Sequence, residues 1–167
     1  MERSEDRPVV VKISEEEFVS ILSEAQAKYE STPEVYCPYF KERVHLNSRG
    51  FEHIRLKRWN KARGRSDQYH RLRLLHLVPE MLRSSHTVQG IWHTSEWERV
   101  KRHGKWIQIL KNVSYFEFVA VLGRVRIKVV LKEIEGGAKF FWTIIPFWKM
   151  NAVTNKRILH EGNPVTD

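Results

Sequence analysis

The side chains best suited to chemistry in this 167-residue chain are histidines and cations, because its sequence offers neither paired thiols nor clustered carboxylates. The chain has eight histidines, and Cys37 is its only cysteine. A single cysteine forms no intramolecular disulfide and no thiolate zinc cluster. No two histidines have the His-Glu-x-x-His spacing of zinc hydrolases, and the second half has no group of carboxylates suited to Mg²⁺. We therefore expect neither a metal site nor a cofactor.

The chemistry open to such residues is metal-free transesterification of RNA, in which the 2′-hydroxyl attacks the adjacent phosphate. A base removes the hydroxyl proton, an acid protonates the leaving 5′-oxygen, and cations stabilise the phosphorane charge. Histidine titrates near neutral pH and suits proton transfer, whereas serine, threonine or tyrosine hydroxyls can donate to phosphate oxygens. Because these residue types are common, composition permits this reaction without identifying it.

The positive charge of the chain is concentrated in one segment. Lysine and arginine total 29 against 20 acidic residues, a net charge of +9. Residues 1–40 carry 4 basic and 9 acidic residues, whereas residues 41–73 carry 11 basic and 3 acidic ones. A concentrated positive field attracts polyanions, and each cation set against a phosphate releases a counterion on binding. RNA is therefore the expected partner, and a solvated basic face is the alternative.

Hydropathy argues against a membrane protein. Unbroken apolar stretches such as residues 118–122 are far shorter than the roughly 18 to 20 residues that cross a bilayer. The acidic N-terminus has no signal-peptide pattern, and a single cysteine suits a reducing compartment. We expect a cytoplasmic protein without a membrane partner.

Helical patterns dominate the first half of the chain. Ser14 and Glu17 have the spacing of a capping box, and apolar residues follow at helical intervals, which predicts a helix over residues 15–30. Its acidic first turn suggests that it shields part of the basic surface or docks a partner. Further helices are predicted over residues 50–59, capped by Asn47 or Ser48, and over residues 68–77, with a basic loop over residues 60–67 between them.

The second of these helices has two distinct sides. Phe51 and Ile54 share its apolar side, whereas His53, Lys57 and Asn60 lie at i, i+4 and i+7 on the opposite, polar side. The spacing predicts an exposed imidazole with a cation beside it.

The second half of the chain has the pattern of extended strands. Runs rich in valine, isoleucine, phenylalanine and tryptophan predict strands over residues 106–110, 115–122, 125–134 and 139–148. Short connections with glycine predict antiparallel hairpins. Along the third run, Arg126, Lys128 and Lys132 alternate with apolar residues, so one sheet face is expected to be apolar and the other basic. We predict an α+β fold in which N-terminal helices pack on one face of a C-terminal four-stranded antiparallel meander.

Three short motifs carry a resemblance to a known family. They are VHLNSRGFEHI at residues 44–54, LVPEML at residues 77–82 and FWTIIP at residues 141–146. In this order they resemble the phage-type branch of the barnase, EndoU, colicin and RelE-like nucleases. The resemblance covers residues 44–149 of a single domain, leaving residues 1–43 as an acidic helix and connector and residues 150–167 as a tail.

The resemblance implies a metal-independent, toxin-like endoribonuclease with helices before a four-stranded meander. His53 matches the family's helical histidine, Thr143 matches the hydroxyl on the last strand, and Arg126 or Lys128 corresponds to a cation on a middle strand. The sequence departs from the family where a second histidine often follows the His-Ile pair, because Arg58 and Trp59 occupy that region. Lysine, arginine or the later His70 would have to substitute there.

Two functions follow from these residues. The first is an endoribonuclease with His53 as the proton-transfer group and with Arg126, Lys128 and Thr143 at the phosphate. The second is a non-catalytic nucleic-acid-binding or phage-associated interaction module that uses the same basic surface. Both have RNA as the partner, and a cognate inhibitor protein is a further candidate partner. Stacking on bases is a minor alternative for Trp142 and Trp148, where a core role is favoured. The predicted contacts to nucleic acid are Lys57, Arg58, Lys61, Arg63, Arg65, Lys132 and Lys149.

Overall fold

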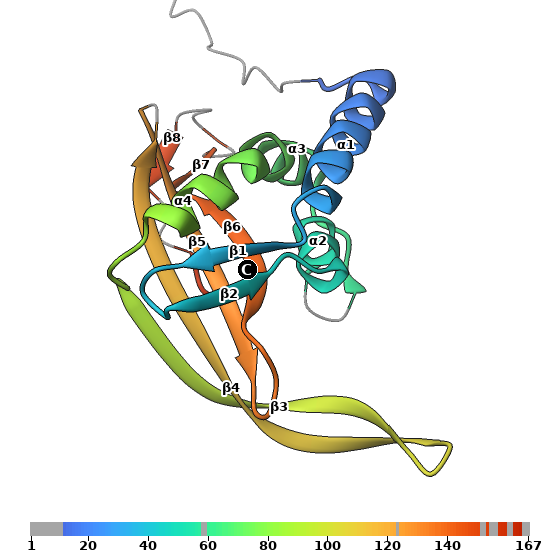
Figure 1. The fold of residues 1–167 in the computed structure, drawn as a ribbon. Helices are drawn as coiled ribbons and strands as arrows, with labels where there is room; N and C mark the ends of the chain where they lie inside the picture. The colour runs from blue at the N-terminus through green and yellow to red at the C-terminus, as the bar shows by residue number, and fades with distance from the viewer. Residues whose placement is uncertain are drawn as a thin grey trace, which may run out of the picture.

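The fold consists of helices and a mixed β-sheet, which confirms the α+β class (Figure 1). The computed structural model describes residues 12–57, 60–122, 124–150, 153, 157–159 and 162–164. The helices are α1 (Glu15–Glu30), α2 (Ser48–Arg55), α3 (Arg65–Leu74), the 3₁₀ helix η2 (Leu75–Leu77) and α4 (Val78–Ser84). The strands are β1 (Glu34–Cys37), β2 (Glu42–His45), β3 (Gly90–Arg102), β4 (Lys105–Leu122), β5 (Val125–Ile134), β6 (Phe140–Pro146), β7 (Trp148–Met150) and β8 (Arg157–Leu159). None of the helices described is long and apolar enough to cross a membrane.

The main sheet has six strands in the order β1-β2-β6-β5-β4-β3, so the expected four-stranded, purely antiparallel sheet is wrong. Strands β3 to β6 do form an antiparallel meander, but the hairpin β1–β2 extends it, and β2 pairs with β6 in parallel at a single position, His45 opposite Phe140. The predicted runs 106–110 and 115–122 belong to one strand, β4. Sequence reasoning missed β3 because an edge strand rich in charged residues lacks the apolar content of a buried strand.

Helix α1 has the predicted boundaries and cap. The Ser14 side chain accepts a hydrogen bond of 3.1 Å from the Glu17 amide. Phe18 and Tyr29 are buried in the same apolar core as the sheet, and the Tyr29 hydroxyl donates to the Asn47 carbonyl oxygen at 2.8 Å. Because α1 contributes to this core, residues 15–30 pack as part of the fold.

Helix α2 packs directly on β6, where β2 no longer pairs with that strand. The Asn47 side chain caps it by accepting from the Gly50 amide at 3.2 Å, and the helix ends at Arg55 rather than at residue 59. A Cβ atom at Gly50 would lie 2.2 Å from the Phe141 carbonyl oxygen. Only glycine therefore permits this close approach.

The sheet has apolar side chains on both faces. On the face toward the helices, the predicted alternation along β5 is confirmed, because Ile127, Val129 and Leu131 are buried in the main core. On the opposite face a smaller cluster contains Val113, Tyr115, Val130 and Ile145, with Trp142 packed against it. The expectation of an exposed basic face is therefore wrong for most of β5, where only Arg126 of the three predicted cations is exposed.

A β-bulge interrupts the pairing of β5 with β6. Leu131 lies opposite Phe141, but Val130 lies opposite Thr143, so Trp142 is an additional residue on β6. The shift brings both Phe141 and Ile144 to the main core although they are three positions apart.

The contact between α2 and β6 gives a first prediction. Gly50→Ala should lower the free energy of unfolding by about 1 to 3 kcal/mol, because a backbone oxygen cannot rotate away from the new methyl group. Gly64→Ala is the control, since nothing lies within 4 Å of a Cβ atom there, and it should change stability by about 0.5 kcal/mol or less. Urea unfolding of both variants measures the difference, and equal effects would contradict the close packing.

Candidate functional site

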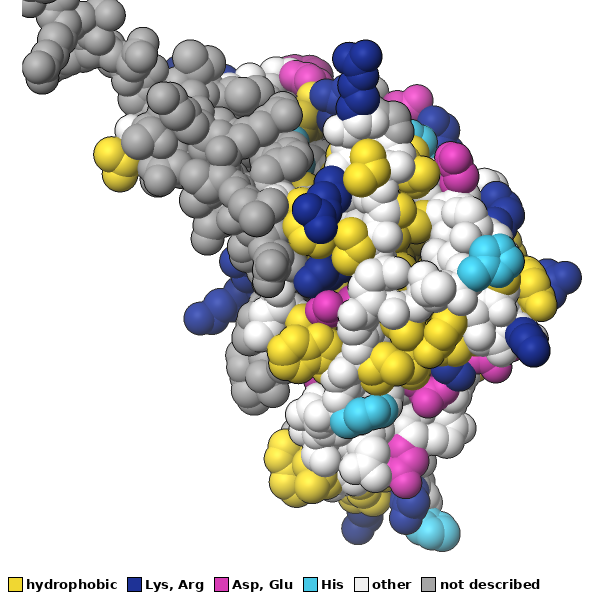
Figure 2. All heavy atoms as spheres, turned by 90° about the vertical axis from the view of Figure 1, so that its left-hand side faces the viewer, with side chains coloured by type: hydrophobic (Ala, Val, Ile, Leu, Met, Phe, Trp, Pro, Cys, Tyr) yellow, Lys and Arg dark blue, Asp and Glu magenta, His cyan; other side chains and the backbone are white. Residues whose placement is uncertain are grey.

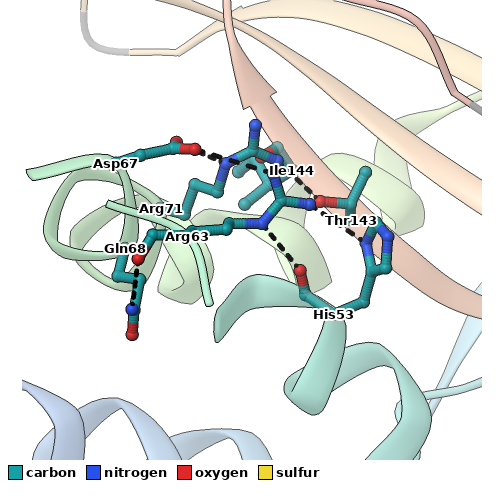
Figure 3. Close-up of polar contacts among 7 residues, drawn as sticks. All are labelled: His53, Arg63, Asp67, Gln68, Arg71, Thr143 and Ile144. Carbon is teal, nitrogen blue, oxygen red and sulfur yellow. Dashed lines mark hydrogen bonds and ion pairs between the residues drawn. The ribbon is translucent and has the colours of Figure 1, made fainter. Parts of the chain in front are cut away.

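His53 lies in the last turn of α2 and is buried, with 7% of its surface exposed. Its ring stacks on the indole of Trp142 at a centroid distance of 3.9 Å and an interplanar angle of 26°. The predicted exposed position is therefore wrong: α2 lies so close to β6 that its polar side also meets the strand. The Arg63 Nε donates to the His53 carbonyl oxygen at 3.0 Å, and Arg63 Nη2 lies 3.5 Å from the imidazole Nδ1 (Figure 3).

Electrostatics keep the imidazole neutral. Burial, and after it the positive charges of Arg63, Arg71 and Lys132, lower the pKa of His53 to about 3, although a backbone hydrogen bond with Trp142 acts in the opposite direction. At neutral pH the ring is uncharged, so it is suited to accept a proton and not to act as an acid.

Thr143 belongs to a buried polar cluster next to His53. Its hydroxyl accepts a hydrogen bond of 2.8 Å from Arg71 Nη1, which also donates to the Ile144 carbonyl oxygen at 3.0 Å (Figure 3). The Arg71 Nε donates to Asp67 at 2.7 Å. Burial raises the pKa of the Asp67 carboxyl, but Arg71 and Arg63 outweigh it and hold this pKa below its usual range. Thr143 is fully buried, so in this arrangement its hydroxyl orients Arg71.

The three predicted cations of β5 have different surroundings. Arg126 is exposed and lies over the Phe147 ring at 4.4 Å, and Lys128 is buried in an ion pair with Glu117 at 3.3 Å. Lys132 lies four residues beyond Lys128, about 13 Å along the strand. The structure therefore places Lys132, rather than Arg126 or Lys128, beside Trp142, the residue on which His53 stacks.

Lys132 is the cation at the centre of the site. It is 2% exposed, and its ammonium lies 2.7 Å from Glu96 Oε2 and 4.1 Å from the centroid of the Trp142 ring. Burial lowers the pKa of this ammonium, and its hydrogen bond to Glu96 opposes that change. The Tyr115 hydroxyl donates to the other oxygen of Glu96. One carboxylate from β3 thus joins a cation from β5 and a phenol from β4.

These residues line a groove of about 840 Å³ between α2 and the strands β3 and β4. At its edge, Arg49 of α2 and Glu98 of β3 form an ion pair of 3.2 Å. The lining residues come from all three sides of the groove: Arg49, Glu52, His53, Leu56, Lys57, Asn60, Glu96, Trp97, Glu98, Arg99, Gln108, Tyr115, Lys132 and Trp142. The lining contains four cations, three carboxylates, an imidazole and a phenol, of which Lys132, His53 and Tyr115 are buried at its base.

The other predicted contacts to nucleic acid do not form one surface. Lys57 lines the groove and Lys61 is exposed, but Arg63 is buried against His53. Arg65 pairs with Glu15 of α1 and lies over the Phe18 ring, which fits partial shielding by the acidic helix. Arg58 lies outside the described residues, as do the side chains of Lys149 and Trp148.

Sequence reasoning missed Glu96, Tyr115 and Arg71 as site residues. Glu96 and Glu98 do alternate with Trp97 and Arg99, which is a strand pattern with an acidic side. No spacing in the sequence, however, places residue 96 beside residue 132. That contact depends on two successive hairpins and their register.

Among the described residues, no three histidine, cysteine, aspartate or glutamate side chains converge as metal ligands would. No protein-family model matches the chain, and neither a curated protein nor a solved structure matches it significantly. The residues of the groove are therefore the basis for assigning a function.

Burial of the imidazole predicts a pH-dependent stability. In the unfolded chain His53 takes up a proton as the pH falls below its ordinary pKa of 6.5, whereas in the folded chain the ring stays neutral to a much lower pH. Protonation therefore favours the unfolded chain, so the free energy of unfolding is highest above pH 6.5 and decreases as the pH falls. The free energy of unfolding should fall by roughly 2 kcal/mol between pH 6.5 and 5. Urea titrations across this range should show a clearly smaller loss for His53→Gln and an unchanged loss for the exposed His86→Gln. Parallel pH profiles for all three proteins would rule out the buried neutral ring.

Proposed function

We propose that this protein is a metal-independent endoribonuclease that binds RNA in the groove between α2 and the β3–β4 hairpin. The observation that carries the proposal is the gathering of a neutral imidazole, an ammonium, a phenol and a carboxylate in one groove with cations at its edge. These are the groups that transesterification requires. The resemblance of three short motifs to the barnase, EndoU, colicin and RelE-like nucleases supports the same reaction and a toxin-like role.

In the proposed reaction, the RNA 2′-hydroxyl transfers its proton to His53 while its oxygen attacks the adjacent phosphorus. The Lys132 ammonium balances the charge on the phosphorane, and the Tyr115 hydroxyl protonates the departing 5′-oxygen. The products are a 2′,3′-cyclic phosphate and a 5′-hydroxyl. A phosphate beside His53 raises the pKa of the ring, which makes the imidazole a better base in the complex than in the free protein. Thr143 acts indirectly by orienting Arg71 next to Arg63.

The second candidate is an RNA-binding module without cleavage. It is favoured by the contacts that the catalytic candidates already make with neighbouring side chains, since His53 stacks on Trp142 and Lys132 pairs with Glu96. In that case the groove exchanges its internal ion pairs for phosphates and does no chemistry. Cleavage separates the two functions, because both predict salt-sensitive binding.

Cleavage should persist in EDTA and depend on His53. A mixed-sequence RNA should yield fragments with 2′,3′-cyclic phosphate ends, and His53→Gln should slow this by about 100-fold or more, the usual loss for a general base. His86→Gln, an exposed histidine outside the groove, is the matched control and should retain the native rate. Circular dichroism checks that both variants fold. Native protein that binds RNA but leaves it intact would support the binding module, and undiminished cleavage by His53→Gln would remove His53 from the mechanism.

The ion pair at the edge of the groove should compete with phosphate. Glu98→Gln releases Arg49, so RNA affinity at low salt should rise by about two- to fivefold, the equivalent of a partly exposed ion pair. The slope of log affinity against log salt should steepen by about one unit for the added contact.

Glu24→Gln controls for net charge in this measurement, since it removes the same charge from the exposed side of α1, away from this groove. It should leave both the affinity and the slope close to native. An equal rise for both variants would show a general effect of charge, and no rise for Glu98→Gln would place the phosphates elsewhere.

A further inference from the structure

The far halves of β3 and β4 form a two-stranded arm that extends away from the sheet (Figure 1). Strand β4 pairs with β5 only from Val113 onward, whereas its pairing with β3 continues to Arg102 opposite Lys105. We call residues 95–112 the arm. A two-stranded hairpin by itself is only marginally stable in water. The exposed side chains of an arm of this length are therefore expected to have a role other than folding.

One face of the arm carries large aromatic side chains exposed to solvent. Trp97 is 68% exposed and lies directly opposite the exposed Leu110, and Trp106 is 58% exposed opposite Lys101. Between them, the Arg99 guanidinium lies 5.2 Å from the centroid of the Trp106 ring. The face therefore carries one aromatic ring on each strand, with Arg99 and Lys101 beside them.

The charge of the arm favours a polyanion over a protein surface. Residues 95–112 carry 5 basic residues and 2 acidic residues. The centres of protein interfaces are depleted in lysine, whereas single-stranded nucleic acids bind grooves that combine cations with stacking aromatics. The lower part of Figure 2 shows hydrophobic side chains together with acidic, basic and histidine side chains.

The arm is also continuous with the candidate site. Trp97 and Arg99 line the same groove as His53 and Lys132. Trp97 stands at the junction, and Trp106 lies about four residues farther out, or about 13 Å.

We propose that the arm binds single-stranded RNA, with unpaired bases stacked on Trp97 and Trp106 and phosphates bound by Arg99 and the neighbouring lysines. The proposal deepens the function proposed above and rests on the groove as an RNA site, because it specifies that the substrate is unpaired. A duplex cannot stack its bases on these rings, since its bases already stack on one another.

The test compares an unpaired RNA with a duplex of the same sequence. Fluorescence anisotropy in EDTA measures the affinity of a labelled 12-nucleotide RNA, with His53→Gln as the background so that the probe stays intact. Trp97→Leu keeps an apolar side chain opposite Leu110 but removes the stacking ring, and it should weaken binding of the single strand by about tenfold. Trp97→Phe should restore most of the affinity, and affinity for the duplex should change little in either variant.

Trp92→Leu is the matched control. Trp92 is also an exposed tryptophan of β3, but it lies opposite Tyr115 in the body of the sheet and outside the groove lining. This variant should bind the single strand with native affinity. Unchanged affinity in Trp97→Leu and Trp106→Leu, or an equal loss for single strand and duplex, would overturn the proposal. A dimer that dissociates in these variants while RNA affinity stays constant would show instead that the arm joins two copies of the chain.

The outcomes for the arm and for cleavage are independent. If the native protein cleaves RNA but the arm variants bind it normally, the proposal for the arm fails and the endoribonuclease proposal stands. If the arm variants lose single-strand binding but the native protein cleaves nothing, the arm remains an RNA-binding element of a non-catalytic module.

Discussion

The close contact between α2 and β6 is the constraint on which the candidate site depends. Because β2 pairs with β6 only at Phe140, the rest of that strand has an edge free of β-pairing on this side, and α2 occupies it. Gly50 allows the backbones to approach, and this approach brings the imidazole of His53 onto the ring of Trp142. The burial that follows sets the protonation state of the histidine. Backbone geometry, rather than any single polar contact, therefore determines which chemistry the ring can perform.

Local patterns in the sequence predicted local structure well. The capping box before α1 and the apolar face of β5 each depend on residues close together in the chain, and both are confirmed. The approximate positions of α2 and α3 were also predictable, although their ends were not, because helix ends depend on contacts outside the helix. The prediction of His53 as exposed failed for a tertiary reason. The helix lies against both β6 and α3, so its buried side is wide enough to include His53 as well as Phe51 and Ile54.

The electrostatic partners could not be predicted because they are distant in the sequence. Lys128 pairs with Glu117 and Lys132 with Glu96, so two cations that appeared free in the alternating pattern are neutralised by carboxylates of β4 and β3. Burying these ammonium groups without partners would destabilise the fold. The second apolar cluster around them therefore requires both ion pairs. The net charge of the chain therefore overstates the charge of the sheet.

The additional residue in β6 links the two faces of the sheet. Trp142 lies at the bulge between Phe141, which enters the main core, and Thr143, which holds Arg71. Removing one residue there would invert every later side chain of the strand, so Ile144 and Ile145 would exchange faces. The side chains of β6 therefore face the core and the groove correctly only when this extra residue is present. The number of residues in β6 is constrained as strictly as their types.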